Sequence, residues 1–279
     1  MVFLVFPATL LVFTLLVAPM AGLLRMSLNQ YSPSELMVEA LSGENYLQAL
    51  SDPYYQNILL TTVIVAFACM LLSVALSLAP AYWLARMESR WKSLITIVTL
   101  FPLLVGNVVR AAGWMALLGN DGAVNAFLRL FGMTEPLQLI YTPFAVVIGT
   151  TAVVMPYMIL TLSSVVENIP RQTEEAAANL GAGPLTVFFR VLLPQAAPGL
   201  LAGCVLVFIL SMNAYATPVL LGGPGFSMLA PAVYEQFVKA ANWPFGAALA
   251  FVLLATTLLL TGAVSFGLAR SLGRDAQQA

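Results

Sequence analysis

The stretch EAAANLGAGPLTVFFRVLLP, residues 175–194, is a polar and glycine-containing interruption in a chain that otherwise consists mostly of long apolar runs. It carries a carboxylate at Glu175, a cation at Arg190 and three successive alanines, and apolar runs flank it on both sides. The apolar runs indicate a chain that lies in a bilayer. The interruption indicates a segment that leaves the bilayer and is available to contact another protein.

Composition places the rest of the chain in lipid. Of its 279 residues, 61% are hydrophobic and only 8% are charged, with a mean hydropathy of +0.93. A soluble domain carries roughly 25% charged residues. The chain therefore has too few charges to cover a water-facing surface, and its net charge of -1 gives no sign of nucleic-acid binding.

The inventory of reactive side chains argues against catalysis by this chain alone. It has no histidine, so the usual general base and proton relay are missing. Its two cysteines, Cys69 and Cys204, lie inside apolar runs, which disfavours a disulfide framework and a metal site. We therefore expect no catalytic residue, no metal site and no cofactor bound by this chain.

A bilayer core requires about 20 apolar residues per helix. The chain is therefore predicted to be an all-α polytopic membrane protein with six spans in one transmembrane domain, 1–279. The expected spans are about 1–24, 56–86, 93–118, 142–166, 197–221 and 245–270. The first run has a signal peptide as its alternative, but no Lys or Arg precedes it and Pro7 and Pro19 interrupt it, so a retained helix is favoured.

Basic residues predict the orientation, because Lys and Arg gather on the cytoplasmic side of a membrane protein. With six spans, one side holds Arg86, Arg90, Lys92, Arg171, Arg190, Arg270 and Arg274, and the other holds Arg25, Arg110, Arg129 and Lys239. The larger group predicts that both termini are inside. The loop at about 167–196 is then cytoplasmic.

Local chemistry predicts a helical hairpin in this loop. Thr173 is expected to be the N-cap of a helix that starts at Glu174, where acids suit the positive helix end. Gly181 and Gly183 are expected to take positive φ and end that helix, and Pro184 begins the next one.

The second arm, residues 184–193, is predicted to be a short separate piece, after which Pro194 and Pro198 redirect the chain into the fifth span. The alanines allow a close approach of another surface, and Glu174, Glu175 and Arg190 are expected to make charged contacts with it. The alternative is a hairpin that only connects two spans.

The spacing of this loop resembles a known motif. Glu175-Ala176-Ala177, then Gly181, then Val191-x-Leu193-Pro194 resembles the EAA loop of the permease subunits of ABC importers, in which isoleucine is usual where this chain has Val191. The resemblance implies a type I importer fold and a coupling helix near 173–183 that docks on an ATPase subunit. The coupling residues that it implies are Glu174, Glu175, Ala176, Ala177, Gly181, Arg190 and Pro194.

Further segments resemble the spermidine/putrescine, or polyamine-type, permease group. These are 107–114, the following 117–122, and 217–224. The family resemblance implies a multi-pass protein of the bacterial inner membrane with two ATP-binding subunits, a second, different but homologous permease chain and an extracytoplasmic solute-binding protein. ATP and Mg²⁺ are expected on the partner ATPases, because this chain lacks a P-loop.

Polar residues inside the predicted spans are candidates for a translocation path. Asn107, Arg110 and Trp114 share one helical face, and Asn213, Tyr215 and Thr217 form a second group. The alternative for the arginine is that it snorkels to the headgroups or pairs with Asp121 or Glu135.

Two alternatives to this function stay open. A polyamine should meet carboxylates, but the spans contain none, so the solute is either a polyamine whose acids come from the partner chain or a neutral or anionic molecule. The rivals of another class are an ion-coupled secondary transporter or channel and a membrane anchor without transport. The first of these would need broken helices in matching halves or intramembrane carboxylates.

Overall fold

A computed structural model describes the backbone of residues 2–275 and the side chains of residues 6–7 and 9–266. The described chain is helical, with one isolated antiparallel bridge between Gln30 and Val38. It divides into two contact units, Met1–Thr61 with Met228–Leu258 and Thr62–Ser227 with Leu259–Ala279. Helices α3 and α13 run through both units. The single permease domain over 1–279 stays a prediction.

The first unit contains a long helix and a short membrane-flanking segment. Its elements are α1 (Val2–Ser27), α2 (Glu44–Ser51), the start of α3 (Pro53–Arg86), α12 (Leu229–Tyr234), the π-helix η2 (Glu235–Lys239) and the start of α13 (Trp243–Asp275). The side-chain amide of Asn45 donates to the carbonyls of Ser27 and Asn29, both at 2.8 Å, and so ties α2 to the end of α1.

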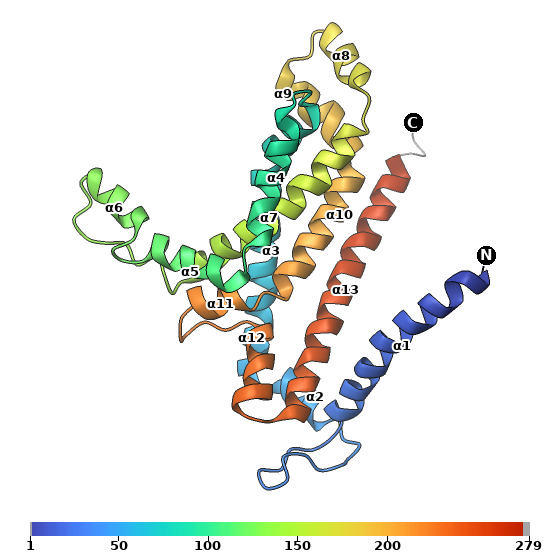
Figure 1. Cartoon of the computed structure of the whole chain (residues 1–279), viewed down its shortest axis with the longest axis vertical. Helices are drawn as coiled ribbons and strands as arrows, with labels where there is room; N and C mark the ends of the chain where they lie inside the picture. The colour runs from blue at the N-terminus through green and yellow to red at the C-terminus, as the bar shows by residue number, and fades with distance from the viewer. Residues whose placement is uncertain (1, 276–279) are drawn as a thin grey trace. The chain divides into compact units, whose positions relative to one another are not determined.

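The second unit contains the remaining helices. They are α4 (Trp91–Leu104), α5 (Asn107–Leu118), α6 (Ala123–Leu130), α7 (Pro143–Glu167), α8 (Arg171–Asn179), α9 (Pro184–Val187), the π-helix η1 (Phe188–Leu192), α10 (Leu193–Met212) and α11 (Ala216–Leu221). Helices α4 and α10 both pack on α7, and α8 lies beyond the ends of these three helices (Figure 1).

Within the described residues, five helices are long and apolar enough to span a membrane, and a sixth span would be a bent pair. That pair is α4 with the helices that follow it, at an angle of 94°. The expectation of one continuous helix over about 93–118 is therefore wrong, although the bent pair still accounts for a span there. The break falls at Val105 and Gly106, which have extended ψ angles of 131° and 143°, at a glycine that is costly inside a helix.

The predicted fifth span, 197–221, is also interrupted. Helix α10 ends at Met212 and α11 begins at Ala216. A continuous helix would need a hydrogen bond from the backbone nitrogen of Pro218 to the carbonyl of Ala214, and proline has no N–H to donate. In the structure Pro218 instead occupies the first turn of α11, where the missing donor costs no helical bond.

The core of the second unit is a close contact between α7 and α10. Gly199 and Gly203 lie one turn apart on α10 and face α7, and a Cβ on them would come within 2.2 Å of Val165 Cγ2 and 2.7 Å of Met158 Sδ. Two small residues with this spacing are typical of tightly packed membrane helices. The contact continues onto α3 through a cluster of Ala81, Leu84, Val154, Met158, Ile159, Leu162 and Val207.

Candidate functional site

The hairpin ends its first helix as its glycine predicts. The N–H groups of Gly181 and Ala182 donate to the carbonyls of Ala178 and Ala177 at 2.9 and 3.1 Å, and Gly181 has a φ of +87°. This pair of bonds is the Schellman motif, which needs a residue with positive φ. Gly183, by contrast, has a φ of -70°, so its predicted positive φ is wrong. Pro184 starts α9, as predicted.

Helix α8 begins earlier than predicted. Pro170 is the N-cap and Arg171 the first helical residue, so Thr173 is not the N-cap. The hydroxyl of Thr173 instead donates to the carbonyl of Pro170 at 2.7 Å. The helix gains a turn because Pro170 already has the extended backbone that an N-cap requires, with a ψ of 132°.

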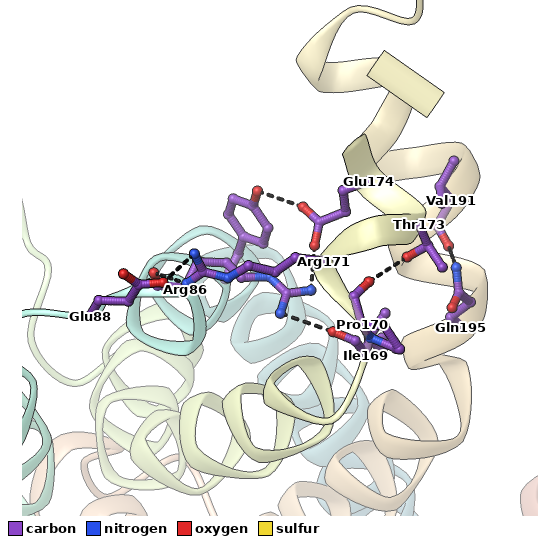
Figure 2. Close-up of polar contacts among 10 residues, drawn as sticks. Arg86, Glu88, Ile169, Pro170, Arg171, Thr173, Glu174, Val191 and Gln195 are labelled. Carbon is purple, nitrogen blue, oxygen red and sulfur yellow. Dashed lines mark hydrogen bonds and ion pairs between the residues drawn. The ribbon is translucent and has the colours of Figure 1, made fainter. Parts of the chain in front are cut away.

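Glu174 is held by two side chains from the end of α3. Its carboxylate pairs with the guanidinium of Arg86 and accepts a hydrogen bond from the hydroxyl of Tyr82 at 2.9 Å. The two charged side chains are only 13% and 14% exposed. Figure 2 shows Arg86 reaching from its helix toward both Glu174 and the carbonyl of Ile169, to which it donates at 3.1 Å.

Arg171 adds a second link between the same segments. It donates to the carbonyl of Arg86 at 2.7 Å and pairs with Glu88 at 2.5 Å (Figure 2). The carboxylate of Glu174 is thus engaged in contacts with other residues of the chain, whereas Glu175 is exposed. The two adjacent acids therefore differ in burial, and both line one small hollow with Tyr82, Arg86 and Arg171.

Three large apolar side chains of the hairpin are exposed. Leu180, Leu185 and Phe189 are 89%, 73% and 55% exposed. Glu175 and Arg190 are exposed with them, Ala176 is exposed, and Ala177 is half-buried. Exposed apolar side chains with charged neighbours are typical of a protein-contact surface.

The second arm of the hairpin is continuous with the fifth span. Residues Pro184–Met212 form one helical run that widens into the π-turn η1 and passes through Pro194 and Pro198. The prediction of a separate short piece that these prolines redirect is wrong. The π-turn ends with a bond from the N–H of Leu193 to the carbonyl of Phe188, and this wide turn makes room for the ring of Pro194.

A cavity of about 600 Å³ lies in the second unit and brings the two predicted path groups together. It is lined by Asn107 and Arg110 of α5 together with Asn213, Tyr215 and Thr217, which lie after the end of α10. Trp114 is absent from the lining, and its ring lies near Gly149 of α7. The remaining lining residues are Leu103, Val108, Thr150, Val153, Val154, Tyr157, Leu210, Ala214 and Ala216.

Arg110 stabilises the break that forms the cavity. Its Nη1 donates to the carbonyl of Pro102 at 2.7 Å, and its Nη2 donates to the side chain of Asn107. A continuous helix would have paired that carbonyl with the N–H of Gly106. Arg110 thus contacts the broken helix end rather than Asp121, which pairs with Arg129 at 3.4 Å.

Sequence reasoning missed Tyr82 and Arg86 as partners of Glu174, and Thr150 and Tyr157 as lining residues of the cavity. A basic residue at the predicted inner end of the second span was the available signal for Arg86. Both cysteines are free, and within the described residues no three His, Cys, Asp or Glu side chains come together as metal ligands.

Comparisons with known proteins support one family. The family model described as "binding-protein-dependent transport system inner membrane component" matches residues 136–275. The spermidine/putrescine transport system permease protein of Escherichia coli (strain K12) is 31% identical over 211 residues, which cover 75% of this chain and 76% of that protein. An inner membrane ABC transporter permease protein of the same strain is 31% identical over 220 residues, 74% of this chain and 70% of the relative.

Solved structures share the fold at low sequence identity. A bacterial ABC transporter involved in the import of the acidic polysaccharide alginate has a TM-score of 0.79 at 14% identity, over 96% of this chain and 94% of that one. An amino acid ABC transporter has a TM-score of 0.53 at 18% identity, over 81% and 98%. With its apolar helices and these relatives, the chain is a multi-pass membrane protein that belongs to the binding-protein-dependent ABC importer permeases and resembles their polyamine group.

Proposed function

We propose that this chain couples ATP hydrolysis on a separate subunit to the passage of a small organic solute across the bacterial inner membrane. The observation that carries the proposal is the hairpin 171–193, which exposes the apolar side chains of Leu180, Leu185 and Phe189 while Glu174 ties its first helix to α3. A hairpin with exposed apolar side chains and an anchored first turn suits a docking element that must transmit movement.

The docking face that we propose combines burial with charge recognition. Leu180 and Leu185 would enter apolar pockets of the ATPase subunit, since most of each side chain is exposed. Fully burying one leucine contributes about 1.5–3 kcal/mol. Glu175 and Arg190 would give direction to the contact, and Ala176 and Ala177 would allow close approach.

The cavity is the proposed part of the translocation path. Relatives are named for spermidine and putrescine, which makes putrescine the first solute to test. The described lining contains Arg110 and no carboxylate. A polyamine would therefore need acids from a second permease chain, and a neutral or anionic solute is the alternative.

The remaining parts of the proposed assembly are two ATP-binding subunits, a second and different permease chain, and an extracytoplasmic solute-binding protein. ATP and Mg²⁺ would bind the ATPase subunits. Hydrolysis there would shift the permease pair between inward-open and outward-open states, which requires that the ATPase bind the two states with different affinity.

A matched pair of exposed leucines tests the docking face. Leu180 on the hairpin and Leu130 at the end of α6 are 89% and 82% exposed. The Leu180→Asp variant is expected to lower the affinity for the ATPase subunit at least tenfold in co-purification from membranes, and Leu130→Asp is expected to leave it unchanged. Equal binding by both variants would overturn the docking proposal. Uptake that persists with an ATPase unable to hydrolyse ATP would favour a secondary transporter.

A further inference from the structure

The end of α3 and helix α8 are joined by a set of polar contacts around Glu174. Arg86 pairs with its carboxylate, Tyr82 donates to it, and Arg86 also donates to the carbonyl of Ile169 at the foot of α8. Arg171 returns a hydrogen bond to the carbonyl of Arg86. These contacts bridge segments more than 80 positions apart in the sequence, so they are a tertiary link and not part of the local hairpin.

Tyr82 joins both arms of the hairpin to the same helix. Its hydroxyl contacts Glu174 on the first arm, and its ring meets the ring of Phe188 on the second arm edge to face, with centroids 5.6 Å apart. Below it, Ala85 packs in a buried cluster with Val166, Ile169, Leu192 and Ala196. The base of the hairpin is therefore held both by polar contacts and by apolar packing.

A packed route leads from this link to the cavity. Ala81 and Leu84 on α3, five and two residues before Arg86, lie in the buried cluster that includes Val154 of α7. Val154 also lines the cavity of about 600 Å³. Close-packed side chains transmit displacement because they have no free volume to absorb it. A movement of α8 that is carried into α3 thus reaches the wall of the cavity through side chains in contact.

We propose that Tyr82 and Arg86 are the positioning residues of force transmission, which hold Glu174 so that α8 and the end of α3 move together when an ATPase subunit moves α8. This inference rests on the proposed docking of α8. Glu174 is then an internal transmission contact, whereas Glu175, which lines the same hollow but is more exposed, is left for the ATPase.

The test measures whether ATP bound elsewhere changes the cavity. The chain carries Val108→Cys, at the cavity lining, with Cys69→Ala and Cys204→Ala, and is assembled with its ATPase subunits in nanodiscs. A membrane-impermeant maleimide reports the labelling rate with and without Mg-ATP. We expect Arg86→Ala to retain ATPase binding within about twofold and to reduce the ATP-dependent change in labelling at least fivefold.

Three further variants separate transmission from simple folding. Exchanging the charges, Arg86→Glu with Glu174→Arg, is expected to restore at least half of the ATP-dependent change. Tyr82→Phe keeps the ring contact, removes one hydrogen bond and is expected to give an intermediate loss. Lys92→Ala breaks an ion pair with Glu167 of 2.9 Å that does not involve α8, and is expected to behave as the unsubstituted chain.

Each outcome decides one of the two proposals. An unchanged ATP response in Arg86→Ala and Tyr82→Phe, with the ATPase bound, would overturn the transmission role and leave docking intact. If the Arg86→Ala chain fails to assemble, Tyr82→Phe alone decides. If the unsubstituted chain binds no ATPase subunit, the proposed function fails, and the transmission role fails with it.

Discussion

Replacing Gly181 by alanine isolates the backbone requirement of the hairpin from its packing. A Cβ added at Gly181 would meet no atom within 4 Å, so the substitution creates no clash. The φ of +87°, however, lies in the left-handed region, which costs a residue with a Cβ roughly 1–2 kcal/mol. The expected loss therefore comes from the backbone alone.

This cost converts into a measurable opening of the turn. A free energy of 1–2 kcal/mol corresponds to a change of about 5- to 30-fold in an equilibrium constant. The amides of residues 181 and 182 are the donors of the two bonds that end α8, at 2.9 and 3.1 Å. Amide hydrogen exchange of the permease in nanodiscs should show these two protons exchanging about 5–30 times faster in Gly181→Ala, because exchange follows the population of the open turn.

Gly183 supplies the matched control. It is also free of neighbours within 4 Å, but its φ is -70°, which alanine adopts without strain. Gly183→Ala should leave exchange at residues 181 and 182 unchanged. Equal exchange rates in the two variants would refute the argument that the left-handed conformation of Gly181 closes the hairpin.

Two further predictions concern the bundle and the cavity. Gly199→Val inserts side-chain atoms where Val165 already lies, so it should destabilise the chain by about 1–3 kcal/mol and lower its melting temperature in detergent. Gly262→Val is the control, because a Cβ at Gly262 has no neighbour within 4 Å. Equal melting temperatures of the two variants would contradict the tight contact between α7 and α10. Arg110→Gln should loosen the break in the third span and reduce uptake of the transported solute into proteoliposomes at least tenfold. Arg129→Gln, which removes an exposed ion pair, should leave that uptake unchanged. Unchanged solute uptake in both variants would show that Arg110 is not part of the translocation path.

Local signals predicted the parts of the hairpin that depend on neighbouring residues. Gly181 was predicted to end a helix and Pro184 to begin one, and the structure confirms both predictions. The start of α8 was predicted three residues too late, because Pro170 is the N-cap in place of Thr173. The contacts of Glu174 with Tyr82 and Arg86 had no local signal, since they depend on how distant segments pack.

Part of the cavity lining was predictable, but the shape of the cavity was not. Asn107, Arg110 and the group around Asn213 were marked out as polar groups in apolar runs, and the structure brings them to one lining. The expectation that each group lies in one continuous helix was wrong, because both spans break next to them. With α5 turned away from α4, Trp114 lies near Gly149 instead of joining the lining.

The breaks explain why polar residues concentrate where they do. Interrupting a helix in an apolar environment frees backbone carbonyls and N–H groups that water would otherwise satisfy, and each unsatisfied group costs several kcal/mol. In the third span Arg110 satisfies the carbonyl of Pro102 from one turn beyond the break, and Asn107 accepts from the same guanidinium. At the end of α10 the break leaves less to satisfy, because the carbonyl of Ile209 accepts from the backbone N–H of Asn213 at 3.3 Å as well as from its side chain at 2.8 Å. Because Arg110 and Asn107 hold the broken end of the third span and also line the cavity, a substitution there changes the shape of the wall together with its polarity.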